Sequence, residues 1–198
     1  MAVTAKMVGE LRKMSAAPMM DCKKALEEND GDIDLAMDYL RKKGISQAAK
    51  KAGRETAEGR IGSYVHHTGK VAAMMELACE TDFCAKAEAF EVFMKDVCMH
   101  IVASDPAPIA LSAADIPVEI LDKEREIYEG QAKESGKPEQ FWPKIVEGRM
   151  AKFVKEVALL EQPFIKDPDV DIQTLLTDLI GKLGENISIR RFEKFQIG

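Results

Sequence analysis

The chain has 198 residues, of which 46% are hydrophobic and 31% are charged, and this length and composition predict a globular protein with a buried core. Its apolar runs are shorter than the roughly 18 residues of a membrane-spanning helix, its start lacks the apolar stretch of a secretory signal, and four cysteines do not make the dense framework of a small secreted protein. We therefore expect a cytoplasmic protein with reduced thiols and no membrane contact.

The formal net charge of −6 is unevenly distributed. Residues 1–54 carry 11 Lys and Arg and 8 Asp and Glu, a surplus of three positive charges, so the remaining residues carry a net charge of −9. The positive charges of residues 41–54 could follow a phosphate backbone, but no aromatic residue lies among them to stack a base. They favour a solvated linker or a surface that steers an acidic partner, and we expect no nucleic-acid partner.

Residues 1–54 predict three short helices and a linker. Apolar residues recur at helical spacing from Val3 to Met14, and the pattern breaks between Ser15 and Pro18. Pro18 suits the first turn of a second helix, because its missing N–H would be unpaired there. Asp32 is a good cap for a third helix, whose apolar stripe is expected to end at a glycine, Gly44. Three such helices are typical of a ubiquitin-associated-like bundle, and small bundles of this kind usually bind another protein.

A calcium loop is an alternative for the same region. Three aspartates between residues 30 and 34 have the spacing with which such a loop opens. Leu35 stands where the loop requires glycine, however, and Arg41 stands where it requires a bidentate glutamate. The sequence therefore argues against calcium.

After residue 55 the apolar period changes from helical to alternating. Apolar and other side chains alternate, as they do in strands, over residues 61–66 and 71–79. Thr68-Gly69 can make a tight reversal between them, so a hairpin is expected. A strand-to-helix corner should follow at Thr81 and Asp82, with a long amphipathic helix beginning at Phe83.

The corner places a carboxylate beside a large aromatic ring, at Asp82 and Phe83. Functional side chains are often placed at such corners of a rigid scaffold. In the alternative interpretation, Thr81 or Asp82 only caps the helix and Phe83 packs under its own first turn. Phe83 is nevertheless the member of the apolar stripe most able to face away from the core.

The second half predicts a helical hairpin and a return to the sheet. Residues 116–158 predict two amphipathic helices joined by a bend at residues 135–138, and the two are expected to form a coiled-coil-like hairpin. Asp171 can cap a further helix. The final strand material, residues 187–197, changes phase around Arg190-Arg191, where a bulge would keep both halves facing the core.

The predicted fold class is α+β, with helix predominating. It combines an N-terminal three-helix ubiquitin-associated-like bundle, a small antiparallel sheet packed with helices, and the helical hairpin. The expected divisions are 1–54 for the bundle and linker, 55–115 for the core hairpin and helix, 116–158 for the helical hairpin, and 159–198 for the C-terminal helix and strand.

The sequence contains the residue types of two kinds of site, a thiol hydrolase centre and a zinc site. Cys84, with Asp82 and either His66 or His67, has the residue types of a thiol hydrolase, and a helix N-terminus near Cys84 would lower its thiol pKa. No oxyanion-hole signature or glycine-rich substrate loop accompanies these residues. The candidate zinc ligands are Cys79, Cys84, Cys98 and His100. Their spacing matches no common zinc motif, so buried free cysteines are favoured.

Neither a Walker loop nor a dinucleotide fingerprint occurs. We therefore expect no cofactor, no metal and no bond chemistry.

Four segments taken together resemble one family. They are MMDCKKALEENDGDIDLAMDYLRKKG, CETDFCAKAEAF, KIVEGRMAKFVKEVALLEQPFIKD and GENISIRRFEKFQIG. In this order they resemble elongation factor Ts, in its short form with one copy of the core. Two departures stand out. Ser15-Ala16-Ala17-Pro18 replaces the usual Thr-Gly-Ala-Gly, and Cys84 and Lys86 stand where valine and arginine are usual.

The resemblance implies a guanine-nucleotide exchange factor that acts on GDP-bound elongation factor Tu, and a homodimer. It implies that Phe83 wedges between partner side chains and loosens the partner's Mg²⁺ and phosphate contacts, while the helical hairpin or the C-terminal part touches another region of the partner. The implied corner set is Thr81, Asp82, Phe83 and Cys84. The implied docking residues on the GTPase domain are Met19, Met20, Asp21, Lys23 and Lys24. The alternative function is a ubiquitin-associated-like adaptor without exchange activity, in which residues 1–54 carry the function and the rest is a scaffold.

Overall fold

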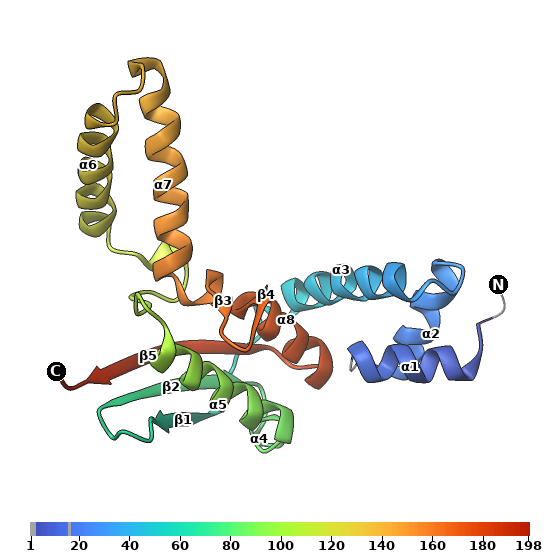
Figure 1. Ribbon diagram of the computed structural model, residues 1–198. Coiled ribbons are helices and arrows are strands. Elements are labelled where there is room, and N and C mark those ends of the chain that lie inside the picture. Colours follow the sequence, from blue (N-terminus) through green and yellow to red (C-terminus); the bar gives the residue numbers. More distant parts are fainter. Residues whose placement is uncertain (1–2, 16) are drawn as a thin grey trace. The chain divides into compact units, whose positions relative to one another are not determined.

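The computed structural model describes residues 3–15 and 17–198, without the side chains of residues 45 and 47 (Figure 1). Ala16, in the predicted break after the first helix, lies outside the described residues. The fold mixes helices with a small sheet, which confirms the predicted α+β class. Two compact units divide the chain: Met1–Gly62 with Glu76–Met94 and Thr174–Arg190, and Ser63–Met75 with Lys95–Gln173 and Arg191–Gly198.

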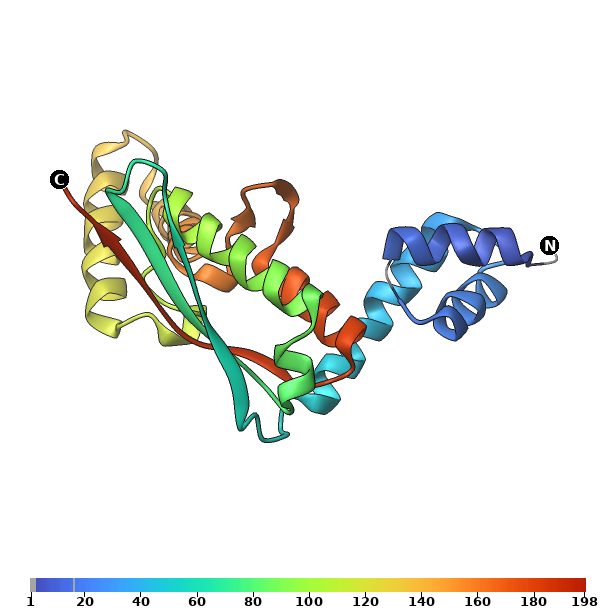
Figure 2. The ribbon, with the colours of Figure 1, turned by 90° about the horizontal axis from the view of Figure 1, so that it is seen from below.

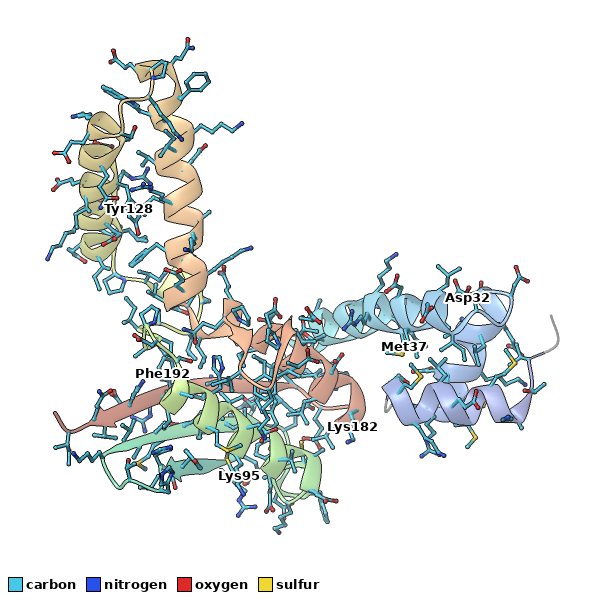
Figure 3. The ribbon with its side chains drawn as sticks, in the orientation of Figure 1. Asp32, Met37, Lys95, Tyr128, Lys182 and Phe192 are labelled. Atoms are coloured by element: carbon cyan, nitrogen blue, oxygen red, sulfur yellow. The ribbon has the colours of Figure 1, made fainter. Side chains whose placement is uncertain are left out.

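The three predicted N-terminal helices are present as α1 (Ala5–Ser15), α2 (Met19–Glu28) and α3 (Ile33–Lys51). Asp32 caps α3, because its Oδ1 accepts a hydrogen bond of 2.9 Å from the backbone N–H of Leu35. Figure 3 shows Asp32 at this end of α3 and Met37 on the side of α3 that faces α1. The buried side chains of the three helices form one core: Val8, Leu11, Cys22, Ala25, Leu26 and Ala36.

Two details of this region differ from the sequence expectation. Pro18 occupies the N-cap of α2, one position before the first turn. The expectation that the third helix ends at Gly44 was wrong, because α3 continues to Lys51. One glycine in a helix costs only about 1 kcal/mol relative to alanine, and the alanines and lysines that follow it are good helix formers. Most of the expected basic linker is therefore helical.

The main sheet has the strand order β1-β2-β5, with β1 at Glu58–Val65, β2 at Val71–Cys79 and β5 at Ile187–Gln196. The predicted hairpin joins β1 and β2, closed by a hydrogen bond of 2.9 Å from the N–H of His66 to the carbonyl of Val71. The strand β5 runs antiparallel to β2, since the N–H just after its end, at residue 197, bonds to the carbonyl at residue 70. Burial along β5 changes phase at residues 190 and 191, which are both exposed, as the sequence predicted. The expectation that both halves of this segment face the core was wrong, because Phe195 is 57% exposed.

The predicted long helix after the corner is divided in two. The structure has α4 at Asp82–Ala85 and α5 at Glu88–Ala103. The expectation of one continuous helix from Phe83 was wrong, because the N–H of Ala87 bonds to the carbonyl three residues back, at Cys84 (3.0 Å), and this tighter turn closes α4. The helix α5 packs on the sheet, where Gly62 of β1 lies so close to Met94 that an added Cβ would collide with it.

The predicted helical hairpin is formed by α6 (Val118–Glu134) and α7 (Trp142–Val157), which lie side by side in Figure 1. Ala132, Val146 and Met150 are buried between them. Figure 3 shows Tyr128 of α6 in the space between the two helices, and the guanidinium of Arg149 lies 5.7 Å from the centre of its ring. At the tip, Trp142 donates a hydrogen bond of 2.9 Å from Nε1 to the carbonyl of Lys137.

Beyond the hairpin the chain forms a small second sheet that the sequence did not predict. It pairs β3 (Pro163–Phe164) with β4 (Asp167–Asp171) in antiparallel fashion, and α8 (Ile172–Leu183) follows at once. Figure 2 shows the loop between these strands and α8 leading into β5. No helix of the described residues is long and apolar enough to cross a membrane.

A buried histidine joins α5 to this second sheet. His100 is 3% exposed. Its Nδ1 accepts a hydrogen bond of 3.3 Å from the N–H of Ile165, and its Nε2 lies 2.9 Å from Oε1 of Gln162. Since Nδ1 is an acceptor, the imidazole is neutral with its proton on Nε2. Burial, opposed by the Gln162 hydrogen bond, lowers the pKa of His100 below its ordinary value.

This burial predicts a loss of stability in mild acid. The unfolded chain takes up a proton at His100 near its ordinary pKa of 6.5, whereas the folded chain does so only at lower pH, so stability is retained above that pH and falls below it. We expect His100→Gln to reduce the fall of the thermal midpoint between about pH 7 and pH 5, and the exposed His67→Gln to leave it unchanged. Equal pH dependence in wild type and His100→Gln would contradict this assignment.

Two glycines give a matched pair of stability predictions. Gly59 has a φ of +151°, and an added Cβ would collide with the backbone of Leu77 and Ala78, whereas Gly130 in α6 has open space around it. We expect Gly59→Ala to lower the free energy of unfolding by about 2 kcal/mol or more, and Gly130→Ala to raise it by about 0.5–1 kcal/mol. Chemical denaturation measures both, and a Gly59→Ala variant as stable as wild type would disprove the collision.

Candidate functional site

The corner between β2 and α4 is fixed locally by Thr81. Its backbone is extended, with φ −131° and ψ 157°, and its Oγ1 accepts a hydrogen bond from the N–H of Cys84 at 3.3 Å. Thr81 is thus the N-cap of α4, as one interpretation of the sequence held. The second part of that interpretation was wrong, because Phe83 does not pack under the first turn. Its side chain is 81% exposed.

Asp82 and Phe83 form an exposed pair at the start of α4. Phe83 is the most exposed large hydrophobic side chain in the part of the chain that the structure describes. Asp82 is also exposed, and its Oδ2 lies 2.7 Å from Nζ of Lys86. The hydrogen bond from Lys86 holds the pKa of Asp82 below its usual value, so the side chain is an ionised carboxylate at neutral pH. The corner therefore presents a negative charge and a bare phenyl ring together.

The corner is held in place by Glu185, which was not among the site residues predicted from the sequence. Its Oε2 accepts hydrogen bonds from the backbone N–H groups of Glu80 (3.1 Å) and Thr81 (2.9 Å). Its Oε1 accepts a third, of 2.6 Å, from the hydroxyl of Thr81. We call these three hydrogen bonds the Glu185 clasp. They tie the end of β2 to the segment just before β5.

The carboxylate of Glu80 bonds in turn to the residue after Glu185 and to Arg54. Oε1 of Glu80 accepts hydrogen bonds from the N–H of Asn186 (2.6 Å) and from the guanidinium of Arg54 (3.3 Å). The buried amide of Asn186 donates in turn to the carbonyl of Arg54 at 2.8 Å. The segment that follows α3 is therefore bonded to the same point as the corner. Because these are mostly charge-assisted or buried hydrogen bonds, they give a well-defined backbone beneath Asp82 and Phe83.

Sequence patterns could not have found this arrangement. Glu185 follows Gly184, whose φ of +78° makes the turn that leads α8 toward β5. A charged residue between a helix and a strand looks like an ordinary loop residue, and its partners lie 104 or more positions earlier in the chain. The only signal was that GENIS belongs to one of the four segments that resemble a family.

Cys84, the fourth residue of the predicted corner set, points inward. It is 5% exposed, and burial, with smaller contributions from Cys79 and Glu185, raises its pKa far above the ordinary value. The expectation that a helix N-terminus lowers this pKa was wrong, since α4 has only four residues and desolvation dominates. The thiol stays protonated and is not an activated nucleophile, which removes the chemical basis for a thiol hydrolase.

The predicted docking residues lie on the first turns of α2. Met19 and Met20 are 55% and 71% exposed, and Lys23 and Lys24 are also exposed. Asp21 differs from the others, because it is partly buried and its Oδ1 lies 2.7 Å from Nζ of Lys43 on α3. The structure therefore offers two methionines and two lysines to solvent here, and gives Asp21 a contact within the three-helix region.

The Glu185 clasp yields a stability prediction. Glu185→Ala would leave two backbone N–H groups and the Thr81 hydroxyl without their acceptor, so we expect the free energy of unfolding to fall by about 1–3 kcal/mol. Glu193→Ala, at an exposed position of β5, is the control and should change it by less than about 0.5 kcal/mol. Equal stability of the two variants, measured by chemical denaturation, would show that the clasp contributes nothing.

Comparisons with known proteins show the family of this chain. A family model described as elongation factor TS matches residues 44–178. Elongation factor Ts of Nitratidesulfovibrio vulgaris is 54% identical over 198 residues, which are 100% of this chain and 98% of that protein. The proteins of the same name from Desulfotalea psychrophila and Geobacter sulfurreducens are 53% and 49% identical over the whole of this chain, and 100% and 91% of their own lengths are covered. The chain therefore belongs to the elongation factor Ts family.

Proposed function

We propose that this chain is the guanine-nucleotide exchange factor of elongation factor Tu, that it acts on the GDP-bound form in the cytoplasm, and that it performs no bond chemistry itself. Family membership supports the role in translation elongation. The observation that supports the mechanism is the pair at the corner: a phenyl ring that is 81% exposed beside an ionised carboxylate, on a backbone held by the Glu185 clasp.

Nucleotide exchange can be explained by the mutual effect of two ligands, this chain and GDP, on each other's binding to the same partner. If this chain and GDP each weaken the binding of the other to elongation factor Tu, then docking of the chain must favour loss of GDP. Each 1.4 kcal/mol or so removed from the barrier to GDP release accelerates it about tenfold. A factor of this kind needs a surface that binds the partner in its open state better than in its GDP-bound state.

Phe83 is the side chain best suited to favour that open state. Transfer of one phenyl ring from water into a protein interior contributes about 1.5–3 kcal/mol, which corresponds to roughly ten- to a hundredfold in rate. In this proposal the ring inserts between partner side chains beside the nucleotide site, and Asp82 presses against the same region, so that the Mg²⁺ and phosphate contacts loosen. Thr81 and the buried Cys84 act by holding the first turn of α4. One ring is not sufficient, so a wider docking surface must supply the rest.

The N-terminal helices are proposed as the first part of that surface. The helices α1 to α3 form the ubiquitin-associated-like bundle in this interpretation, and α2 presents Met19, Met20, Lys23 and Lys24 to the GTPase domain. Exposed methionines adapt to varied apolar surfaces, and the lysines suit an acidic partner surface. Asp21, bonded to Lys43, keeps α2 in register with α3.

The helical hairpin is proposed as a second contact, with another region of the same partner. Its two helices would act as a short coiled coil, with Ile127 of α6 and Phe141 at its tip 42% and 48% exposed. A homodimer is supported separately by apolar side chains of the main sheet: Val65, Met74 and Phe195 are 61%, 45% and 57% exposed. An unpaired apolar sheet face of this kind suits a second copy of the chain. The net charge of −6 supports the absence of a nucleic-acid partner.

The central prediction concerns Phe83→Ala. We expect this variant to slow release of fluorescent GDP from elongation factor Tu by about tenfold or more, with an unchanged thermal midpoint because the ring makes little contact with its own fold. Val92→Ala, an exposed apolar position on α5 (52% exposed), is the matched control and should release GDP as wild type does.

The same assay separates the exchange factor from the adaptor alternative, which the bundle and its exposed methionines favour. An adaptor would bind elongation factor Tu without accelerating GDP release, and Phe83→Ala would change nothing. A wild-type chain that leaves the GDP release rate unaltered would therefore contradict the proposed function, and an unaltered rate for Phe83→Ala alone would contradict the wedge.

A further inference from the structure

Three side chains with metal-binding atoms meet beneath the corner. Cys79 comes from the end of β2, Cys84 from α4, and Glu185 from the segment before β5. Their ligand atoms all lie within 4.8 Å of one another, and no other group of three or more His, Cys, Asp or Glu side chains among the described residues does so. The two cysteines are buried and free of any disulfide, and Glu185 is partly buried. Elements far apart in the sequence thus place two thiols and a carboxylate together.

The distances suit a tetrahedral ion. With metal–sulfur bonds of about 2.3 Å, two sulfur ligands of zinc lie about 3.8 Å apart, so ligand atoms within 4.8 Å of one another need to close by about 1 Å or less. A fourth donor is near, because the carbonyl oxygen of Thr81 lies 3.1 Å from Sγ of Cys79. The two sulfur atoms, the Glu185 carboxylate and this carbonyl oxygen would be the four donors of the site.

The carboxylate of Glu185 is held in one orientation by its hydrogen bonds. Oε2 of Glu185 is fixed by the backbone N–H groups of Glu80 and Thr81, and Oε1 by the hydroxyl of Thr81. Each carboxylate oxygen has more than one lone-pair site, so Oε1 can bind an ion while it keeps its hydroxyl donor. Hydrogen bonds of this kind are the usual outer support of a metal ligand, and they fix its direction and strengthen it.

Electrostatics also favour a cation at this position. Burial raises the pKa of both cysteines, and the negative potentials of Glu185 and, for Cys84, of Cys79 raise it further. Two thiols and a carboxylate are therefore crowded together, and this environment disfavours the charged forms of the two thiols. A divalent ion offsets this penalty, because its two positive charges balance those of the two thiolates.

We propose that Cys79, Cys84 and Glu185 form a binding site for a thiophilic divalent cation, for which zinc is the natural ion. Two thiolates and one carboxylate select zinc over magnesium or calcium. On binding, the ion replaces the two thiol protons, which pass to solvent, and nothing is oxidised or reduced. In the sequence, Cys98 and His100 are the other candidate ligands beside Cys79 and Cys84, and their spacing matches no common zinc motif. The structure replaces them with Glu185, which no spacing rule connects to the cysteines.

The test is a metal titration of the full-length, reduced and metal-free chain. We expect one Co²⁺ or Cd²⁺ ion per chain, with the thiolate-to-metal charge-transfer absorption that two cysteine ligands give, and zinc should displace it. Binding should release protons and tighten as pH rises. The zinc affinity, measured by competition with a chromophoric chelator, should fall by at least about 100-fold in Cys84→Val and by about 10- to 100-fold in Glu185→Gln.

Cys98→Val is the matched control, since it makes the same substitution at a buried cysteine outside the group, and it should bind as wild type does. Far-UV circular dichroism checks that each variant is folded. The proposal is overturned if wild type shows no charge-transfer absorption at one ion per chain, if Cys84→Val binds zinc as tightly as wild type, or if Cys98→Val loses affinity to the same extent. The wild-type titration alone decides the question if a variant does not fold, and none of these outcomes depends on exchange activity.

Discussion

The structure depends most on one carboxylate. Glu185 accepts three hydrogen bonds from Glu80 and Thr81, and Glu80 returns the contact through Asn186. Two strand ends that are far apart in sequence are fixed to each other at this point. Because Thr81 is held there and also caps α4, the first turn of that helix has a defined direction, and successive residues turn by about 100° around it. Phe83 then faces solvent while its neighbour, Cys84, faces the interior.

A fixed exposed ring is useful to a protein that must change the state of its partner. An apolar side chain on an ordered backbone loses little conformational entropy when it is buried in another molecule, so more of its transfer free energy remains for the partner's conformational change. The ionised Asp82 beside it keeps the corner soluble and adds a charge. In the proposed function, the methionines of α2 and the helical hairpin extend the contact area, so that docking and the opening of the nucleotide site would rest on different parts of the chain.

Local patterns predicted much of this fold and part of the site. Apolar periods identified the helices, the β1–β2 hairpin and the phase change at residues 190 and 191, because each is set by neighbouring residues. The continuation of α3 past Gly44 was missed, since one glycine in a helix costs only about 1 kcal/mol relative to alanine. The break after α4 was missed because the residues around it, Ala85, Lys86 and Ala87, are good helix formers and do not signal the tighter turn at Ala87. Glu185 was missed for a different reason: its partners are distant in sequence. The raised pKa of Cys84 comes mainly from burial, with smaller contributions from Cys79 and from Glu185, and the helix N-terminus on which the sequence argument relied has only four residues.

The central claim is that this chain and GDP disfavour each other on elongation factor Tu, with Phe83 as part of the coupling. Its most direct measurement is the affinity of the chain for elongation factor Tu with and without bound GDP, for wild type and for Phe83→Ala. We expect wild type to bind nucleotide-free elongation factor Tu much more tightly than the GDP-bound form. The ratio of these two affinities should equal the factor by which the chain weakens GDP binding. In Phe83→Ala the ratio should be smaller. Equal affinity of wild type for the two forms would contradict the central claim.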